Sequence, residues 1–539
     1  MSDSSSAISA TGPAPARTVG DSLESFAWRV DRQWALIILI LAVIYIVLIV
    51  PTVHRHLWFD ELHTFYISQA TSVRQFIDET RLLDLNPPVP YLLTRASIRV
   101  LGPTEVGTRL PVIVGYFLGS IGMFIFLARR VGSLWAAAGV GLLWYNQSFY
   151  FASEARPYGV LLGFMGLMLV SWDYATTSES SKIWRRWALV GVAVGAAGML
   201  LSHVYAPLWV MPFWAGVLVR NWKQRRIDWP LWAAMVLPMA ACLTYLPLVQ
   251  NVGHAVFPPE FQGSVSKAVW FYLRTIFQVA PPLLAGGLTA FGIAAWRRAS
   301  SGAIAHPSGA ATGIPAHEMA FLLFSLLPPA LLNALAIQKH MAFYDRHAFL
   351  TTLTAYLLLV LFIAYESRAN RLSGLAAAVI VLGFTVFLPA KSLAPKPPVD
   401  ASTEPNPGPL RKDFDQIHPE LPFVTNSVFT FLEMDHYANP ALVGRLYYLV
   451  DPESSVKYAH SNMTEGLPVL KQYFPIRGNA PSYADFAATH RHFLVWGEMD
   501  MNGWLLRKLK TEGARLTKIG TFEAPYLDAE LYEVWLDPS

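Results

Sequence analysis

Residues 34–63 read WALIILILAVIYIVLIVPTVHRHLWFDELH, an apolar segment that ends in a charged and aromatic one. The apolar part, 34–53, is long enough to cross the roughly 30 Å hydrocarbon core of a bilayer as a single helix. No small-residue cleavage site follows it, so we expect a retained first span rather than a signal peptide. The pair Asp60-Glu61 then falls at the membrane surface. Because ionisable groups are costly to hold near the bilayer core, those that persist there are candidate functional residues.

The composition is that of a membrane protein. Of the 539 residues, 54% are hydrophobic and 14% are charged, and the mean hydropathy is +0.36. Soluble domains carry about 25% charged residues. The net charge of +4 is small and the basic residues form short clusters between apolar runs, which argues against a nucleic-acid partner. The single cysteine, Cys242, excludes a disulfide framework or a cysteine metal site within one chain.

Apolar runs of membrane-spanning length recur along the chain and predict an α-helical multi-pass membrane protein with eleven spans. If the N-terminus is cytoplasmic, alternate loops hold nearly all of the basic loop residues, as cytoplasmic loops do. We therefore expect a cytoplasmic (inner) membrane protein whose C-terminus, after an odd number of spans, lies outside. The predicted spans are 34–53, 108–128, 133–152, 157–176, 187–203, 204–219, 229–250, 270–296, 317–337, 347–365 and 372–391.

Two regions outside the membrane are large enough to have structure of their own. The first outer loop has amphipathic stretches at 61–83 and 87–101, which predict helices lying in the interface plane. In the C-terminal region, strand-like and helix-like runs alternate, which predicts a small α/β domain with a mainly parallel sheet. The predicted segments are a disordered cytoplasmic tail at 1–33, a transmembrane domain at 34–391 with its first outer loop at 54–107, a Pro-rich linker at 392–410, and the outer α/β domain at 411–539.

Asp60 and Glu61 have two interpretations. Both could simply start a helix, because Asp is a good N-cap and Glu in the first turn complements the helix dipole. Alternatively, a carboxylate at the interface, shielded by Trp58 and Phe59, could act as a general base toward an acceptor hydroxyl. Adjacent helical residues point about 100° apart, so the two acids need not share one task.

Three further polar clusters fall at outer ends of predicted spans. Each has an ordinary explanation: an ion pair beside a helix-starting proline, a hydrogen-bonded structural histidine, or basic anchors for lipid headgroups. By the predicted topology, however, all of them share the outer face with Asp60, and basic residues there could hold a phosphoryl group. The clusters are 151–158 with Glu154 and Arg156, 202–205 with His203, and 339–347 with Lys339 and Arg346.

These motifs resemble those of membrane glycosyltransferases of the C superfamily, most closely glycosyltransferase family 39, over about residues 30–390. That family includes protein O-mannosyltransferases and the aminoarabinose transferase that acts on lipid A. Ser202, Val204 and His347 depart from it, since the corresponding family elements carry Thr, Tyr and Tyr. The elements that carry the resemblance are Asp60-Glu61, Asn86-Pro87-Pro88 with Tyr91-Leu92-Leu93, Ser153-Glu154-Ala155-Arg156-Pro157-Tyr158, Ser202-His203-Val204-Tyr205 and Asp345-Arg346-His347.

The resemblance implies a hexosyl- or pentosyltransferase that moves a sugar from a polyprenyl-phosphate donor, with inversion, to a hydroxyl or amine outside the membrane. The acceptor would be a glycan, a lipid or a protein. Asp60 inherits the role of the base, with Glu61 as the second catalytic candidate. A phosphate leaving group needs fixed cations in a dry site but no second carboxylate. The implied substrate- and phosphate-binding residues are Asn86, Glu154, Arg156, Tyr158, His203, Lys339 and Arg346.

A metal ion is left open by the sequence. Carboxylate and imidazole ligands suit zinc or manganese. Because the arginines and Lys339 could supply the positive charge, no obligatory metal or other cofactor is predicted. The candidate ligands are His54, His56, Asp60, Glu61 and His63.

Two other classes of function compete with the enzyme. A transporter or flippase of lipid-linked sugar would have charged or helix-breaking residues at mid-membrane and inverted repeats, and no repeat is evident. A non-catalytic membrane scaffold would leave the four outer motifs as a coincidence. The sequence names neither the sugar nor the acceptor.

Overall fold

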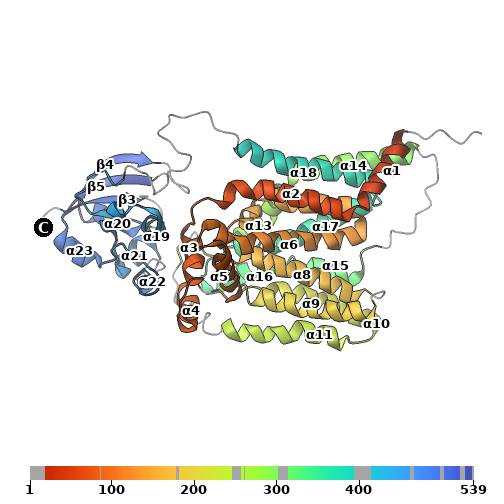
Figure 1. The fold of residues 1–539 in the computed structure, drawn as a ribbon, viewed down its shortest axis with the longest axis horizontal. Helices are drawn as coiled ribbons and strands as arrows, with labels where there is room; N and C mark the ends of the chain where they lie inside the picture. The colour runs from red at the N-terminus through yellow and green to blue at the C-terminus, as the bar shows by residue number, and fades with distance from the viewer. Residues whose placement is uncertain are drawn as a thin grey trace, which may run out of the picture.

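The computed structural model describes residues 19–84, 86–177, 181–245, 257–259, 261–300, 313–393, 414–461, 467–497, 503–522 and 529–536. They form a helical bundle and a small domain built on a sheet, which lie at the two ends of the molecule (Figure 1). Three first-loop helices, α3 (Phe59–Ile67), α4 (Val73–Glu79) and α5 (Val89–Leu101), lie where the two bodies meet (Figure 1). Of the predicted linker 392–410, the first two residues belong to helix α18 (Arg371–Leu393), and 394–410 lie outside the described residues.

Every predicted span contains a helix. Five helices of the described chain are long and apolar enough to cross a membrane alone, and the bent pair α13–α14 makes a sixth candidate. The protein is thus a helical membrane protein with several spanning helices, and the count of eleven stays a prediction. The bundle helices are α1 (Val19–Asp31), α2 (Trp34–Val53), α6 (Glu105–Val131), α7 (Ser133–Tyr145), α8 (Tyr158–Thr176), α9 (Lys182–Leu200), α10 (Pro207–Gln224), α11 (Trp229–Val236), α13 (Val265–Phe277), α14 (Ala280–Ser300), α15 (Ala316–Phe324), α16 (Pro328–Lys339), α17 (Leu350–Glu366) and α18 (Arg371–Leu393).

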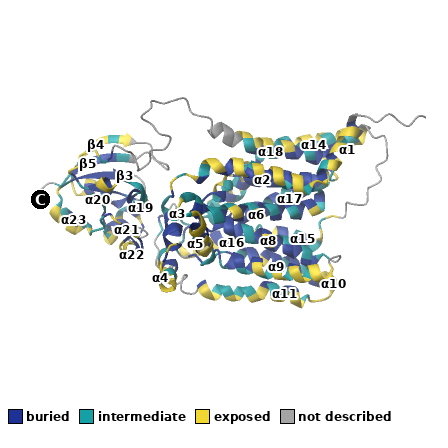
Figure 2. Ribbon diagram, in the orientation of Figure 1, coloured by how far each residue is buried: buried dark blue, intermediate teal, exposed yellow. Residues whose placement is uncertain are grey.

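The surface of the bundle shows that it faces lipid. Helix α2 buries Leu41 and Tyr45 against the other helices but exposes the equally apolar Leu39 and Ile46. Exposed residues follow the outer faces of the peripheral helices (Figure 2). A helix that is apolar on every side, and that leaves one side exposed by its protein neighbours, is stable in the hydrocarbon core of a membrane and not in water.

Helices α6 and α8 pack closely enough to fix the centre of the bundle. A Cβ atom on Gly122 of α6 would lie only 2.5 Å from the Cα atom of Gly166 on α8, so the two backbones touch there. Small residues permit this kind of approach between membrane helices. The contact matters for function because the N-terminal ends of both helices lead into the site described below.

Two predicted boundaries differ from the structure. Residues 19–31 of the tail predicted to be disordered form helix α1, since Ala27 and Asp31 are buried against the bundle and Asp31 accepts a hydrogen bond from the Leu134 N–H at 3.0 Å. The first interfacial helix is divided into α3 and α4, followed by the π-helical turn η1 (Thr80–Asp84). The division arises because Ser72 caps a new helix, with its side chain accepting from the Gln75 N–H at 3.1 Å.

The C-terminal domain is a five-stranded sheet in the order β2-β1-β3-β5-β4. β1 pairs parallel with β2 and β3, but β5 pairs antiparallel with β3 and β4. The prediction of a mainly parallel sheet is therefore wrong for β4 and β5, because their connection, 523–528, is too short for the crossover that parallel strands require. The elements are β1 (Phe423–Thr425), α19 (Val428–Tyr437), α20 (Pro440–Gly444), β2 (Leu446–Tyr448), α21 (Pro452–Ala459), α22 (Leu467–Tyr473), α23 (Tyr483–Thr489), β3 (His492–Gly497), α24 (Trp504–Thr511), β4 (Arg515–Phe522) and β5 (Ala529–Trp535).

Candidate active site

Asp60 is the second residue of α3, and its carboxylate lies between two arginines. The N-cap of this helix is Trp58, so the helix-start interpretation of Asp60 as a cap is wrong. Asp60 Oδ2 lies 3.4 Å from Arg346 Nη1 and 3.6 Å from Arg156 Nε, and 17% of the side chain is exposed. The carboxylate is thus reachable and is held by charge rather than by short hydrogen bonds.

Glu61, its neighbour, is fully buried and fully engaged. Arg109 binds it in a bidentate manner, with Nε–Oε1 at 2.7 Å and Nη2–Oε2 at 2.5 Å, and neither side chain is exposed. The Ala155 N–H also donates to Glu61 Oε1 at 2.7 Å. The remaining Arg109 N–H groups donate to carbonyl groups at the end of α2. Glu61 therefore ties α2, α3, α6 and the 153–156 segment together, and the ~100° step between neighbouring helical residues separates its task from that of Asp60.

Arg156 is held by an acidic residue that the sequence analysis did not single out. Arg156 Nη1 lies 2.8 Å from both carboxylate oxygens of Asp84, and it also donates to the Asp60 carbonyl at 3.3 Å. Asp84 is in turn held by the Tyr91 hydroxyl at 2.5 Å, while Asn86 donates to the Asp84 carbonyl at 3.1 Å. The carboxylates of Asp84 and Asp60 outweigh the effect of burial and raise the pKa of Arg156. The Asn-Pro-Pro motif thus acts through Asp84 to place this arginine.

The carboxyl group of Glu154 is buried beside two other acidic residues. Within the described chain its Oε2 atom has no hydrogen-bond partner, and the residue is only 2% exposed. Burial, followed by the nearby carboxylates of Glu61 and Asp60, raises the pKa of Glu154 to about 8. The side chain is accordingly neutral at pH 7 and can donate a hydrogen bond.

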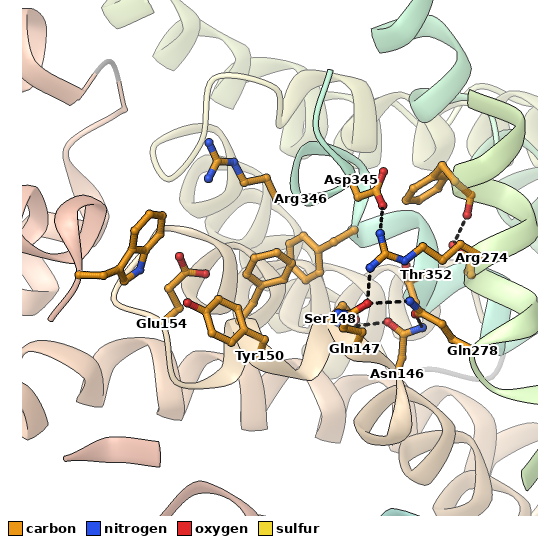
Figure 3. Close-up of a pocket in the computed structure, with 15 residues that line it drawn as sticks. Asn146, Gln147, Ser148, Tyr150, Glu154, Arg274, Gln278, Asp345, Arg346 and Thr352 are labelled. Atoms are coloured by element: carbon orange, nitrogen blue, oxygen red, sulfur yellow. Dashed lines mark hydrogen bonds and ion pairs between the residues drawn. The ribbon is translucent and has the colours of Figure 1, made fainter. Parts of the chain in front are cut away.

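A pocket of 480 Å³ opens beside these residues (Figure 3). Glu154 and Arg346 both line this pocket, and the close-up shows their side chains at the end away from Arg274 and Gln278. The other end is polar and is built by η2 (Gln147–Ala152), α13 and η4 (Asp345–Ala348). The lining residues are Trp58, Asn146, Gln147, Ser148, Tyr150, Phe151, Glu154, Phe271, Arg274, Thr275, Gln278, Asp345, Arg346, Phe349 and Thr352.

Arg274 anchors the polar end and was also missed from the sequence. It pairs with Asp345 at 2.7 Å and donates to Gln147, which further accepts from Gln278 at 2.9 Å (Figure 3). Helix α13 bends by 48° against α14 directly after this polar turn, just before the Pro281-Pro282 pair that predicted a break. A charged residue inside the predicted apolar run 270–296 was the signal that could have revealed it.

His203 and Tyr158 form an aromatic layer behind the arginines. The ring of His203 lies 5.5 Å from that of Tyr158 and 6.2 Å from that of His347. Burial, together with the charges of Arg156 and Arg346, lowers the pKa of His203 to about 3, so the imidazole is neutral. Its Nδ1 atom accepts from the Tyr205 N–H at 3.2 Å.

Lys339 is not brought into this group. It is exposed at the C-terminal end of α16 and, among the described residues, is not one of those that line the pocket. The residue C-terminal to it, His340, has a φ of 53° and ends the helix, so Lys339 and Arg346 stand on different elements, α16 and η4.

The candidate metal ligands do not converge. Across the ranges that the structure describes, no group of three or more His, Cys, Asp or Glu side chains is arranged to hold a metal ion. His54 is exposed, and His56 stacks on Tyr437 with 4.2 Å between ring centroids. His63 packs against Phe59 and Phe474 instead. Burial lowers the pKa of His63 despite the nearby carboxylates.

The C-terminal domain holds the start of α3 directly. Glu433 Oε1 accepts from the Phe59 N–H at 3.2 Å, and the Tyr437 hydroxyl accepts from the Leu57 N–H at 2.7 Å. Because the first N–H groups of a helix lack internal partners, Glu433 satisfies one of them from another domain. Helix α19 thus fixes the backbone on which Asp60 stands.

This architecture is similar to that of a solved membrane protein. No protein-family model matches the chain, and no curated protein matches it in sequence. Among solved structures it is similar to ArnT from Cupriavidus metallidurans bound to undecaprenyl phosphate, with a TM-score of 0.52 and 14% identity, over 93% of this chain and 98% of that one. The chain has the fold of ArnT. The apo structure of the same protein matches with a TM-score of 0.41 and 14% identity, over 94% of this chain and 98% of that one.

ArnT is a lipid A aminoarabinose transferase with the fold of the C superfamily, so the fold that the sequence motifs implied is confirmed. The match extends over almost the full length of both chains, which includes the C-terminal domain as well as the bundle. At 14% identity the similarity shows a shared fold only. The roles of individual residues rest on the geometry described above.

Proposed function

We propose that this chain is an inverting glycosyltransferase that moves a sugar from a polyprenyl-phosphate donor to a hydroxyl or amine acceptor at the outer surface of the membrane. The observation that carries the proposal is the reachable Asp60 carboxylate, 3.4 Å from Arg346 at one end of a pocket among membrane helices. The printed description of the similar ArnT structure, bound to undecaprenyl phosphate, supports a lipid-linked donor.

The reaction is a single displacement. The acceptor oxygen loses its proton to Asp60 and attacks the anomeric carbon from the face opposite the phosphate. The bond between that carbon and the phosphate oxygen breaks, and the lipid phosphate leaves with the electron pair. Arg346 and Arg156 stabilise the growing phosphate charge. One carboxylate suffices, since the phosphate leaves without being protonated.

Two glutamates support this step without taking the proton. The carboxylate of Glu61 is bound by Arg109 and links α3 to the 153–156 segment. We therefore assign Glu61 a positioning role in place of a catalytic one. Neutral Glu154 lines the pocket next to Arg346 and is suited to donate a hydrogen bond to a sugar or phosphate oxygen.

Turnover tests the proposal. The purified chain in nanodiscs is incubated with polyprenyl-phosphate sugars that differ in the sugar, and release of polyprenyl phosphate is measured by chromatography. We expect release with one sugar class and an inverted anomeric centre in the product by NMR. Retention of configuration, or release from no donor of the panel, contradicts the proposal.

One feature favours a second candidate, a flippase of lipid-linked sugar. The bent pair α13–α14, with Arg274 one turn before the break, is the kind of interrupted charged helix that carriers use. The two candidates separate in proteoliposomes, because Asp60→Asn should abolish transfer but leave transbilayer movement of the lipid unchanged.

A further inference from the structure

A second cavity of 480 Å³ lies between the first outer loop and the C-terminal domain, apart from the pocket that holds Arg346. Its walls come from the second half of α3, the turn that follows it, helix α4, helix α19, and the end of α22 with the segment after it. Both bodies of the molecule are therefore needed to form it, at their junction in Figure 1. The lining residues are Phe65, Tyr66, Gln69, Thr71, Gln75, Asp435, His436, Tyr473, Pro475 and Arg477.

Asp435 is the buried polar group of this cavity. Its Oδ1 atom is fixed by two backbone donors, the Arg477 N–H at 3.0 Å and the Gly478 N–H at 2.6 Å. Its Oδ2 atom has no hydrogen-bond partner in the described part of the chain, and the residue is only 1% exposed. A buried acceptor left without a donor is destabilising, so a site that keeps one is suited to a ligand that donates a hydrogen bond.

The remaining walls combine aromatic rings with hydrogen-bonding side chains. Tyr66 is fixed by a 2.6 Å bond between its hydroxyl and His436 Nδ1, and its ring lies against Phe474. Tyr473 is half-buried, and Arg477 is exposed at the rim. The charges of Asp435 and Arg477 offset each other, which disfavours a phosphate or another strongly charged ligand.

We propose that this cavity binds a neutral saccharide, which is part of the acceptor of the transfer reaction. Ring faces for the apolar sides of a pyranose, with a fixed carboxylate oxygen for its hydroxyl groups, are the chemistry that a polyhydroxylated ring requires. The assignment deepens the proposed function and rests on it, since it makes the acceptor a glycan rather than a protein.

The position of the cavity relative to Asp60 supports the acceptor role. Phe65 and Tyr66 stand on the same helix as Asp60, five and six residues further along, and Gln69 follows the end of that helix. At a rise of 1.5 Å per residue, Phe65 and Tyr66 are displaced from Asp60 along the helix axis by roughly 7–9 Å. A short oligosaccharide that binds there can present its next hydroxyl group at Asp60.

Binding by the full-length protein in detergent tests the assignment without requiring turnover. An array of immobilised bacterial and eukaryotic oligosaccharides is probed with wild type, Asp435→Asn and Tyr473→Ala. Asp435→Asn keeps an oxygen for the two backbone donors but replaces the free acceptor with a donor. We expect saccharide binding to fall at least tenfold in both variants, at an unchanged melting temperature. Gln472→Ala, an exposed neighbour of Tyr473 that does not line the cavity in the described structure, is the matched control and should bind as wild type does.

The other outcomes overturn the inference. Binding to no glycan, equal binding by all variants, or binding to unfolded peptides only would each exclude a saccharide site here. Failure of the proposed function is a separate result: Asp60→Asn should bind the same glycans as wild type, so a saccharide site without transfer activity would refute the enzyme assignment and leave the cavity's ligand class standing.

Discussion

The two ends of the helical bundle use the same kinds of charged residue in different ways. At the end away from the C-terminal domain, Asp173 binds Arg129 and Arg130, each at 2.7 Å, and 4% of its side chain is exposed. At the pocket end, Asp60 lies 3.4 Å from Arg346 and is 17% exposed. The first carboxylate is held by both partners at short distance, whereas the second lies farther from its partners and is more exposed.

The glutamates repeat this difference. Glu318, next to the first group, binds Arg130 at 2.7 Å. Glu154, at the pocket, keeps an oxygen without a partner among the described residues and has its pKa raised to about 8. Complete pairing therefore marks acidic groups that maintain the structure, such as Asp173 and, at the pocket end, Glu61, whereas incomplete pairing marks the groups at the pocket end that are suited to meet a ligand.

The largest effect on turnover is expected from Asp60→Asn. The change keeps the size of the side chain and does not touch the helix cap, because the cap is Trp58. It removes the proton acceptor, which is worth roughly 10²–10⁴-fold in rate. The measurement is turnover of the purified variant at saturating donor, with donor binding as the control. Turnover within threefold of wild type would rule out Asp60 as the base.

Arg346→Ala should come next. A charge-assisted hydrogen bond to phosphate is worth about 1.5–3 kcal/mol, so kcat/KM for the donor should fall by roughly 10- to 100-fold. Lys339→Ala removes an exposed basic residue of the same predicted cluster and is the matched control. Equal loss of activity in both variants would show that Lys339 contributes to phosphate binding as much as Arg346 does.

Glu154→Gln should change the pH dependence of stability more than the rate. The folded-state pKa of about 8 exceeds the ordinary 4.5, so the folded protein binds the extra proton and wild-type stability falls as pH rises from 4.5 to 8. The variant lacks this loss, and its melting temperature relative to wild type should rise across that window. A difference between the two proteins that is constant from pH 5 to pH 8 would show that Glu154 is already ionised.

Asp173→Asn should leave turnover per folded molecule unchanged. Removing one member of a buried ion pair costs about 3–5 kcal/mol, so the variant should unfold at a lower temperature in detergent. Activity is normalised to the monodisperse fraction from gel filtration. A drop in normalised turnover comparable with that of Asp60→Asn would erase the distinction between the two ends of the bundle.

Local patterns were sufficient to find much of the site. Asp60, Glu154, Arg156 and Arg346 stand out because charge is rare at the outer ends of membrane spans, and the structure brings these four together. Arg109 and Asp84 gave no such signal. Arg109 follows an ordinary helix start, and Asp84 falls just after the amphipathic stretch 61–83, so their importance lies in partners distant along the chain.

Arg109 and Asp84 were missed, whereas Lys339 was included wrongly in the predicted phosphate-binding cluster. By composition it belongs with Arg346, since both are basic and close in sequence before the tenth predicted span. The end of α16 and the turn at His340 separate them, and only Arg346 reaches the pocket. Sequence proximity therefore grouped residues that the backbone conformation places apart.

What the sequence by itself determined is where most of the helices and strands are, and it predicts that the polar motifs share one face of the membrane. These features follow from hydrophobic periodicity and charge within short stretches of sequence, so they can be predicted without knowing which residues contact each other. What only the tertiary structure decided is which partner each charged group receives. Asp60 and Glu61 are adjacent and chemically alike, yet Glu61 faces Arg109 in a closed ion pair while Asp60 faces the arginines at the pocket. The reason is that a partner is selected by packing between helices distant in sequence, and a rotation of about 100° between neighbours is enough to separate a structural acid from a reactive one.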